Sequence, residues 1–351
     1  MPDQIITEAI DTLCNGRSLT EDQAAEVLSE IMHGEVSEIQ IAGFLVALRT
    51  KGETVQELAG LARVMRELAV PVVLERGDLL DTAGTGGGRS SFNVSTTAAL
   101  IAAGSGCAVA KHGNRSATSR SGSADLLEAL GARIDLAPEQ VADCIREAGF
   151  GFMFAPTHHQ ATRFVIPVRR ELAVRTIFNM LGPLTNPAGA RRQLIGVSDP
   201  GFLETMAGAL ALLGVDRALV VSAEDGLDEV SASAPTHIVE VNGEEIRSYL
   251  LRPEDARLAG GGEAPAGGTP AENAALTEAI LRVDGPSDGP VAGDDVALIN
   301  AGAAIYVAGA ADTIAEGVQA ARAALDDGRA AEALSRYLAA SRRHAPAESS
   351  R

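Results

Sequence analysis

From about residue 78 onward, short apolar runs typical of strands alternate with longer runs typical of helices. The strand-like runs are DLLDTAG, CAVAKHG, FGFMFAP, RQLIGVS and RALVVSAE, and helix-like runs such as STTAALIAAGSG and PEQVADCIREAG stand between them. This alternation is typical of a parallel α/β sheet, because parallel neighbours need a crossover connection. We therefore predict an α/β fold with a mainly parallel central sheet, whose ligands bind outside the carboxyl ends of the strands.

The first 70 or so residues have helical patterning instead. Three residue pairs have the spacing of a capping box: Thr20 with Gln23, Ser37 with Gln40, and Thr54 with Glu57. Gly34 and Gly52 are expected helix stops. We predict a small all-helical domain over residues 1–72, a large α/β domain over 73–340 and a flexible tail over 341–351.

Two later segments bear on this division. Residues from about 162 to 187, TRFVIPVRRELAVRTIFNMLGPLTNP, are predicted to be helical and to return to the helical domain. The Gly/Ala/Pro-rich segment LAGGGEAPAGGTPAENA is predicted to be a mobile loop.

Charge and composition exclude several classes of function. The formal net charge of −18 disfavours binding to nucleic acid or to an anionic membrane. The N-terminal residues have no signal-peptide pattern, and the longest apolar stretch is broken by glycine and serine. The three cysteines have no CxxC spacing and are expected to be free thiols. We expect a cytoplasmic protein.

The stretch DTAGTGGGRSSFNVST, residues 81–96, joins a predicted strand to a predicted helix. Its four closely spaced glycines are Gly84, Gly86, Gly87 and Gly88, and small hydroxyl side chains follow them. Strand, glycine loop and helix together present backbone N–H groups and a helix N-terminus to phosphate. The stretch is not a Walker A motif, and a tight turn without a ligand remains the alternative.

A second candidate element, KHGNRSATSRSGS at residues 111–123, follows the strand CAVA. It gathers Lys111, His112, Arg115 and Arg120 in one hydroxyl-rich loop of an otherwise acidic chain. Cations with oriented N–H and O–H donors suit a ligand that carries two or three phosphates. A solvated basic loop is the alternative.

A third element is the pair Asp228 and Glu229, which follows the strand RALVVSAE. Adjacent carboxylates at a strand end suit Mg²⁺ that is also held by a phosphorylated substrate and water. The alternative is an exposed acidic turn.

These elements, with further motifs, resemble the anthranilate phosphoribosyltransferase family over roughly residues 1–340. The matching segments are GTGG (84–87), FNVST (92–96), KHGNRSATSRSGS (111–123), FMFAPTHH (152–159), PVRRELAVRTIFNMLGPLTNP (167–187) and DGLDEVS (225–231). The resemblance implies a fold like that of nucleoside phosphorylases and class II phosphoribosyltransferases, and a homodimer. It also implies transfer of the phosphoribosyl group from phosphoribosyl pyrophosphate to anthranilate with Mg²⁺, expected as two ions.

The resemblance also implies roles for individual residues, at the positions of this sequence that match the family's motifs. Those expected to bind phosphoribosyl pyrophosphate are Gly84, Gly87, Gly88, Ser91, Asn93, Val94, Ser95, Thr96, Lys111, His112, Gly113, Asn114, Arg115, Ser116, Ala117, Thr118, Ser119 and Ser123. Those expected to bind anthranilate are Gly84, Asn114, His159, Arg169, Gly182 and Pro183. The expected metal ligands are Ser95, Asp228 and Glu229. No residue is assigned as a general acid or base.

One position departs from the family pattern, which usually reads GTGGD, because residue 88 is glycine here. The change removes a carboxylate beside the expected diphosphate. It is expected to affect the affinity for phosphoribosyl pyrophosphate and the arrangement of the metal ligands. Three alternatives stay open: a pyrimidine nucleoside phosphorylase, a non-catalytic relative that binds nucleic acid, and an inactive structural homologue. The uninterrupted KHGNR and NMLGPLTNP segments favour the anthranilate enzyme over the first, and the acidic charge disfavours the second.

Overall fold

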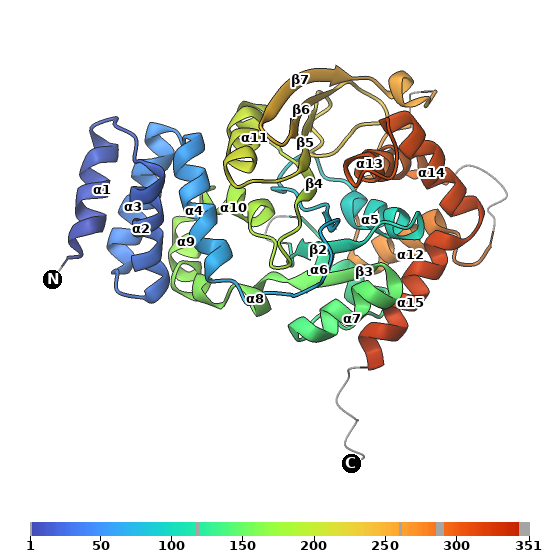
Figure 1. Cartoon of the computed structure of the whole chain (residues 1–351), viewed down its shortest axis with the longest axis horizontal. Helices are drawn as coiled ribbons and strands as arrows, with labels where there is room; N and C mark the ends of the chain where they lie inside the picture. Colours follow the sequence, from blue (N-terminus) through green and yellow to red (C-terminus); the bar gives the residue numbers. More distant parts are fainter. Residues whose placement is uncertain (1, 117–118, 260–261, 286–290, 344–351) are drawn as a thin grey trace, which may run out of the picture.

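A computed structural model of the chain describes residues 2–116, 119–259, 262–285 and 291–343. Its centre is a seven-stranded sheet with the order β3-β2-β1-β4-β5-β6-β7 (Figure 1). The strands are β1 Leu80–Asp81, β2 Val109–Gly113, β3 Phe150–Phe154, β4 Arg192–Gly196, β5 Arg217–Ala223, β6 Thr236–Asn242 and β7 Glu245–Leu251. The first five strands pair in parallel, and β6 and β7 add an antiparallel hairpin at one edge. The prediction of an α/β fold with a mainly parallel sheet is confirmed.

Four helices form the N-terminal end of the molecule, at the left of Figure 1. They are α1 Gln4–Cys14, α2 Glu21–His33, α3 Glu38–Lys51 and α4 Val55–Glu67. Complete capping boxes begin α2 and α4, as predicted, and the helix stops at Gly34 and Gly52 are also present. At α3 only half of the predicted box forms, because the side chain of Gln40 bonds to the backbone of Asp3 instead.

The segment predicted to be helical from about 162 to 187 is mainly helical up to Leu184, begins earlier than predicted, at Ala155, and runs along this N-terminal group. Its elements are α8 Ala155–His158, η1 Gln160–Phe164, α9 Ile166–Leu172 and α10 Phe178–Leu184. Element η1 contacts α2, α9 contacts α3, and α10 contacts α4. The boundaries of the two domains stay a prediction.

Buried side chains on the two faces of the sheet belong to two separate clusters. Along β5, Leu219 and Val221 join one cluster, whereas Ala218 and Val220 join the other. The first cluster is covered by α5 Val94–Gly104, α6 Ser123–Ala129, α7 Pro138–Ala148, α12 Pro270–Leu281, α13 Asp294–Val307, α14 Ile314–Asp326 and α15 Arg329–Arg343. The second contains α11 Leu203–Leu212 and α1 to α4, so the helical group shares its core with one sheet face.

Two predictions about irregular segments differ from the structure. The carbonyl of Pro265 accepts a hydrogen bond of 3.2 Å from the N–H of Phe92, and Thr269 caps α12, which begins at Pro270. The mobile-loop prediction is therefore wrong for residues 270–274, which form the start of α12. Residues 341–343 complete the last turn of α15 rather than belonging to a tail, and 344–351 lie outside the described residues.

Short elements η2 Pro200–Phe202 and η3 Pro253–Ala256 complete the described structure. In its described parts, no helix has the length and apolar character needed to span a bilayer. Cys14, Cys107 and Cys144 are free thiols, as expected.

Candidate active site

The order of the strands reverses at the centre of the sheet. After β1 the chain adds β2 and β3 on one side, and it then returns to add β4 and β5 on the other. The carboxyl ends of β1 and β4 therefore border the point at which the strand order reverses, where open α/β sheets bind their ligands. The glycine loop, residues 84–88, starts at this point because it follows β1.

Three loops after three neighbouring strands stack closely here. The N–H of Thr85 donates a hydrogen bond of 2.8 Å to the carbonyl of Gly196, at the end of β4. A Cβ atom at Gly84 would lie 3.1 Å from that same carbonyl, and one at Gly196 would collide with the carbonyl of Asp228. The absence of side chains at Gly84 and Gly196 thus lets the loops after β1, β4 and β5 touch.

The glycine loop lies directly on the Asp228 carboxylate, which accepts the backbone N–H groups of Gly86 and Gly88. Burial raises the pKa of Asp228, whereas these hydrogen bonds and the nearby Arg175 lower it. A Cβ atom at Gly88 would lie 2.5 Å from Oδ1 of Asp228 and 2.9 Å from the carbonyl of Gly226. In this conformation the aspartate usual in the family has no room at position 88.

Lys111, Ser95 and Glu229 meet beside this loop, although they are far apart in the sequence. Lys111 is only 1% exposed, and its Nζ donates to Oγ1 of Thr82 at 3.0 Å and to Oγ of Ser95 at 3.4 Å. The backbone N–H of Ser95 donates to the Glu229 carboxylate. Burial raises the pKa of Glu229 to about 8 and lowers the pKa of Lys111, since both groups lie in a region of low polarity.

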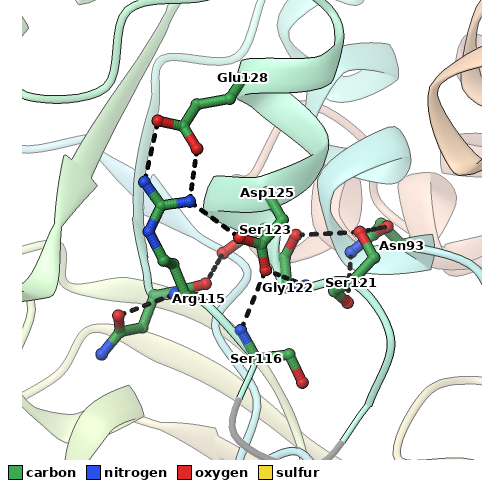
Figure 2. Close-up of polar contacts among 9 residues, drawn as sticks. Asn93, Arg115, Ser116, Ser121, Gly122, Ser123, Asp125 and Glu128 are labelled. Carbon is green, nitrogen blue, oxygen red and sulfur yellow. Dashed lines mark hydrogen bonds and ion pairs between the residues drawn. The ribbon is translucent and has the colours of Figure 1, made fainter. Parts of the chain in front are cut away.

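The basic loop, residues 111–123, folds around an acidic side chain of the helix that follows it (Figure 2). Nη1 of Arg115 donates to Asp125 at 2.9 Å, and the same guanidinium also pairs with Glu128. The N–H groups of Ser116 and Gly122 donate to the second oxygen of Asp125. The sequence predicted that Lys111 and Arg115 face a phosphorylated ligand, but here Lys111 is buried and Arg115 is in ion pairs.

Asn93 connects the start of α5 to the basic loop and to α12. Its side chain donates to the carbonyl of Ser121 at 3.2 Å and accepts from Ser121 Oγ at 3.1 Å and Asn273 Nδ2 at 2.8 Å. Val94 and Thr96, which follow Asn93 in the first turn of α5, are buried.

The remaining residues expected to bind phosphate take part in short local contacts. Ser91 Oγ donates to the carbonyl of Phe92, the N–H of Ser119 donates to Ser116 Oγ, and Ser123 Oγ donates to the carbonyl of Asn114. Gly113 lies against Ser123. Ala117 and Thr118 lie outside the described residues.

His112, His158 and His159 are buried and lie close to one another. Nδ1 of His112 donates to the carbonyl of Gly182 at 3.1 Å, and Nδ1 of His158 donates to the carbonyl of Val70 at 2.9 Å. The rings of His112 and His159 are 5.0 Å apart, centroid to centroid. Burial lowers the pKa of His112 to about 3 and of His159 to about 4, so both rings are neutral at pH 7. In the described structure, Nε2 of each of the three rings lacks a hydrogen-bond partner.

The other residues expected to bind anthranilate flank this histidine group. Pro183, inside α10, is buried, and its carbonyl accepts from Gln193 Nε2 at 2.8 Å. Arg169 projects from α9 with its guanidinium carbon 5.6 Å from the centroid of the Phe178 ring. The Asn114 side chain accepts the N–H of Arg115 at 2.7 Å.

Two residues that sequence reasoning missed are central to this geometry. Asp81 is fully buried and accepts hydrogen bonds from the backbone of Thr82 and His112 and from Asn186 Nδ2. Arg175 Nη2 donates to the carbonyl of Gly86 at 2.9 Å. An acidic residue that ends an apolar strand was a usable signal for Asp81, whereas the contact made by Arg175 spans 89 residues.

The expected metal ligands fit Mg²⁺ that is held partly by a substrate. Within the described residues, no group of three or more His, Cys, Asp or Glu side chains could hold a metal ion. Mg²⁺ usually keeps several waters and is bound through one or two carboxylates together with substrate phosphates. Asp228, Glu229 and the Ser95 hydroxyl supply that donor set.

Comparisons with known proteins agree with this geometry. The helical bundle domain of a glycosyl transferase family matches residues 7–69, and the a/b domain of a glycosyl transferase family matches 76–331. The anthranilate phosphoribosyltransferase of Rubrobacter xylanophilus is 51% identical over 97% of this chain and 98% of its own length. The chain belongs to the anthranilate phosphoribosyltransferase family.

Other relatives support this assignment. The anthranilate phosphoribosyltransferase of Moorella thermoacetica is 49% identical over 94% of this chain and 96% of its own. The crystal structure of the Thermus thermophilus enzyme matches with a TM-score of 0.87 and 48% identity, over 95% of this chain and 99% of that one. The Saccharomyces cerevisiae enzyme in complex with PRPP and Mg matches with a TM-score of 0.84 and 25% identity, over 95% and 97% of the two chains.

Proposed function

We propose that this member of the anthranilate phosphoribosyltransferase family transfers the 5-phosphoribosyl group from phosphoribosyl pyrophosphate to the amino group of anthranilate. The products are N-(5-phosphoribosyl)anthranilate and pyrophosphate, and the reaction is the second step of tryptophan synthesis from chorismate. The observation that carries this proposal is the meeting of Lys111, Ser95 and Glu229 beside the glycine loop, at the reversal of the strand order.

The diphosphate is proposed to bind on the glycine loop and at the start of α5. Backbone N–H groups of Gly86 and Gly88, which now donate to Asp228, are donors of the kind that phosphate oxygens accept. Asp228, Glu229 and Ser95 are proposed to hold Mg²⁺, as two ions, together with the substrate. Bound there, Mg²⁺ stabilises negative charge on the leaving diphosphate.

Anthranilate is proposed to bind between α9 and the histidine group. Arg169 can pair with the anthranilate carboxylate through a planar fork, and Asn114 can orient the amine. Burial and neutral rings make the surroundings of His112 and His159 suitable for an aromatic ring, which has little polar surface to hydrate.

Positioning and charge stabilisation account for catalysis in this proposal, and no residue is assigned as acid or base. The bond between C1 of the ribose and the diphosphate breaks, the amine nitrogen bonds to C1, and the amine loses one proton. An oxocarbenium-like transition state at C1 is expected, as in other glycosyl transfers. Holding the weak amine in line lowers the barrier by several kcal/mol, up to roughly 7–11 kcal/mol in favourable cases.

Anthranilate fluorescence tests this function directly. Consumption of anthranilate should require both phosphoribosyl pyrophosphate and Mg²⁺, and the Asp228→Ala/Glu229→Ala variant should show no Mg²⁺-dependent turnover. Unchanged fluorescence with the wild-type chain under these conditions would contradict the proposed reaction, and full activity of the double variant would contradict the metal assignment.

A homodimer is the proposed assembly, formed through the exposed face of α3 and the adjoining α9 segment. Ile39 is 84% exposed and Val46 is 43% exposed, seven residues apart on α3, and Ile166 and Val174 are exposed on and after α9. Such apolar side chains on two contacting helices favour burial against a second copy.

The two-domain division at about residue 72 and a cytoplasmic location are likewise proposals.

A further inference from the structure

Arg175 lies between the helical group and the glycine loop, in the segment that joins α9 to α10. Its backbone position is fixed from several sides. Its carbonyl accepts a hydrogen bond of 2.7 Å from Nη1 of Arg49 on α3. The next N–H, of Thr176, donates to Asn179 Oδ1 at 3.0 Å, and Ala173 ends α9 in the left-handed region with φ of 51°. The backbone that carries the Arg175 side chain is therefore held in a defined position, although the residue is exposed.

The guanidinium lies on the glycine loop. Nη2 donates to the carbonyl of Gly86 at 2.9 Å, and a Cβ atom at Gly87 would lie 2.5 Å from Nη1. Gly87 has a φ of 89°, a conformation that favours glycine, and its missing side chain leaves the space that Arg175 fills. The positive charge of Arg175 also acts on Asp228. An exposed arginine thus lies in contact with the loop proposed to bind the diphosphate.

The contacts around Asp228 would be exchanged when substrate binds. Gly86 and Gly88 now donate their N–H groups to Asp228, and Arg175 is attracted by the same carboxylate. A diphosphate offers these N–H groups new acceptors and places several negative charges beside the loop. A guanidinium binds phosphate oxygens in a planar fork and remains charged at every working pH.

We propose that Arg175 is a further binding residue for the diphosphate of phosphoribosyl pyrophosphate. This inference rests on the proposed function. It assigns to the segment between α9 and α10 a contact with the leaving group, in addition to the proposed contact of Arg169 with anthranilate. Through Arg49, the same segment connects the helical group to the diphosphate site.

Calorimetric titration of phosphoribosyl pyrophosphate with Mg²⁺ present, in the absence of anthranilate, tests this assignment. Arg175→Gln keeps an N–H group for the carbonyl of Gly86 but removes the charge, and it should raise the Kd roughly tenfold. Arg175→Lys keeps the charge and should recover most of the affinity. The matched control is Arg146→Gln on α7, where an exposed arginine pairs with Asp143, and its Kd should equal that of the wild type.

The outcomes separate this inference from the proposed function. If the wild type binds the substrate and Arg175→Gln binds it equally well, the assignment of Arg175 is wrong and the proposed function stands. A lysine variant as weak as the glutamine variant would also overturn the assignment, since charge would then not be the cause. If the wild type binds no phosphoribosyl pyrophosphate, both proposals fail. In steady-state kinetics, the KM for anthranilate should change less than about twofold in Arg175→Gln, because Arg175 contacts the glycine loop and not the residues proposed to bind anthranilate.

Discussion

Single side chains at the two ends of the proposed site are placed by different elements, so their roles can be separated. Arg169 lies on α9, and burial lowers the pKa of its guanidinium, although a group with so high an ordinary pKa stays charged at neutral pH. A half-buried cation of this kind gains from a carboxylate partner. The diphosphate side, by contrast, is formed by the loops after β1 and β5.

Arg169→Ala should therefore weaken the use of anthranilate far more than that of phosphoribosyl pyrophosphate. Loss of a charged hydrogen-bonded pair costs about 1.5–3 kcal/mol, which corresponds to roughly a 10- to 100-fold rise in KM for anthranilate, against less than about twofold for phosphoribosyl pyrophosphate. Steady-state kinetics with each substrate varied in turn measure both values. Arg170→Ala, at the exposed neighbour on the same helix, is the control, and an equal loss for both substrates would contradict the role of Arg169.

Position 88 gives a second prediction at this scale. A side chain there collides with Asp228 and Gly226, so Gly88→Asp should lift the glycine loop from Asp228 in the ligand-free chain. Trypsin should then cut faster after the adjacent Arg89, as followed by mass spectrometry. Gly77→Asp is the control, because a Cβ atom at Gly77 has no neighbour within 4 Å. Equal cleavage rates for Gly88→Asp and the wild type would show that the close contact does not hold the loop.

Among the elements, the N-terminal helices depend on a buried charged residue in a capping box. Glu57, at the start of α4, is 0% exposed, yet its carboxylate accepts from the N–H of Leu19, from Thr54 and from Lys51 Nζ at 2.8 Å. It thus caps α4 and also joins α4 to the end of α3 and to the residues before α2. The capping-box spacing was visible in the sequence, whereas its burial and its further partners were not.

Glu57→Ala should lower the free energy of unfolding by about 3–5 kcal/mol, because it leaves the ammonium of Lys51 buried without its partner. Urea denaturation measures this change. Arg63→Ala removes two partly exposed ion pairs, with Glu21 and Asp22, in the same helical group and should cost at most about 1 kcal/mol. Similar losses in the two variants would mean that burial gives Glu57 no special importance.

The elements also show how far the sequence could be interpreted. Strand–helix alternation predicted the positions of β1 to β5 because periodicity and glycine-rich ends are local signals. Buried partners such as Asp81 with Asn186, 105 residues apart, depend on the packing of β1 beside the end of α10. The ion pairs of Arg115 with Asp125 and Glu128 were missed because a basic run was treated apart from the helix that follows it.

For the molecule as a whole, we expect acidic pH to lower the free energy of unfolding partly through the buried histidines. His159 has a folded-state pKa of about 4, below its ordinary value of about 6.5, and its titratable neighbours are His112 and His158. The unfolded chain therefore takes up a proton first as pH falls. The stability contributed by the neutral ring is present above about pH 6.5 and is lost as pH falls toward 4.

When the pH is lowered from about 6.5 to 5, one such histidine should reduce the free energy of unfolding by about 1.5 kcal/mol. His159→Gln should reduce the drop between these pH values by that amount in urea denaturation, whereas His33→Gln, at an exposed histidine, should leave it unchanged. An unaltered drop in the His159 variant would place the acid sensitivity elsewhere.

Assembly is the remaining prediction for the whole molecule. Ile39→Glu places a charge in the exposed apolar face of α3 and should convert the proposed homodimer into a monomer, as measured by light scattering. Leu212→Glu, at an exposed apolar residue at the end of α11, should leave the mass unchanged. A wild-type chain that is already monomeric at micromolar concentration would contradict the dimer.

The stacking of Gly84 on Gly196, and of Gly196 on Asp228, has a consequence for how such a chain can change. A methyl group at Gly196 would collide with the carbonyl of Asp228, and one at Gly84 would lie only 3.1 Å from the carbonyl of Gly196, so a library randomised at positions 84 and 196 should yield active clones that encode glycine at 196 and mostly glycine at 84. The loops after β1, β4 and β5 are in contact where they leave the sheet. Evolution can therefore change the residues farther along these loops, but not the spacing between the loops at the sheet. New acceptor specificities should therefore arise by substitution on α9 and α10, at a distance from this junction.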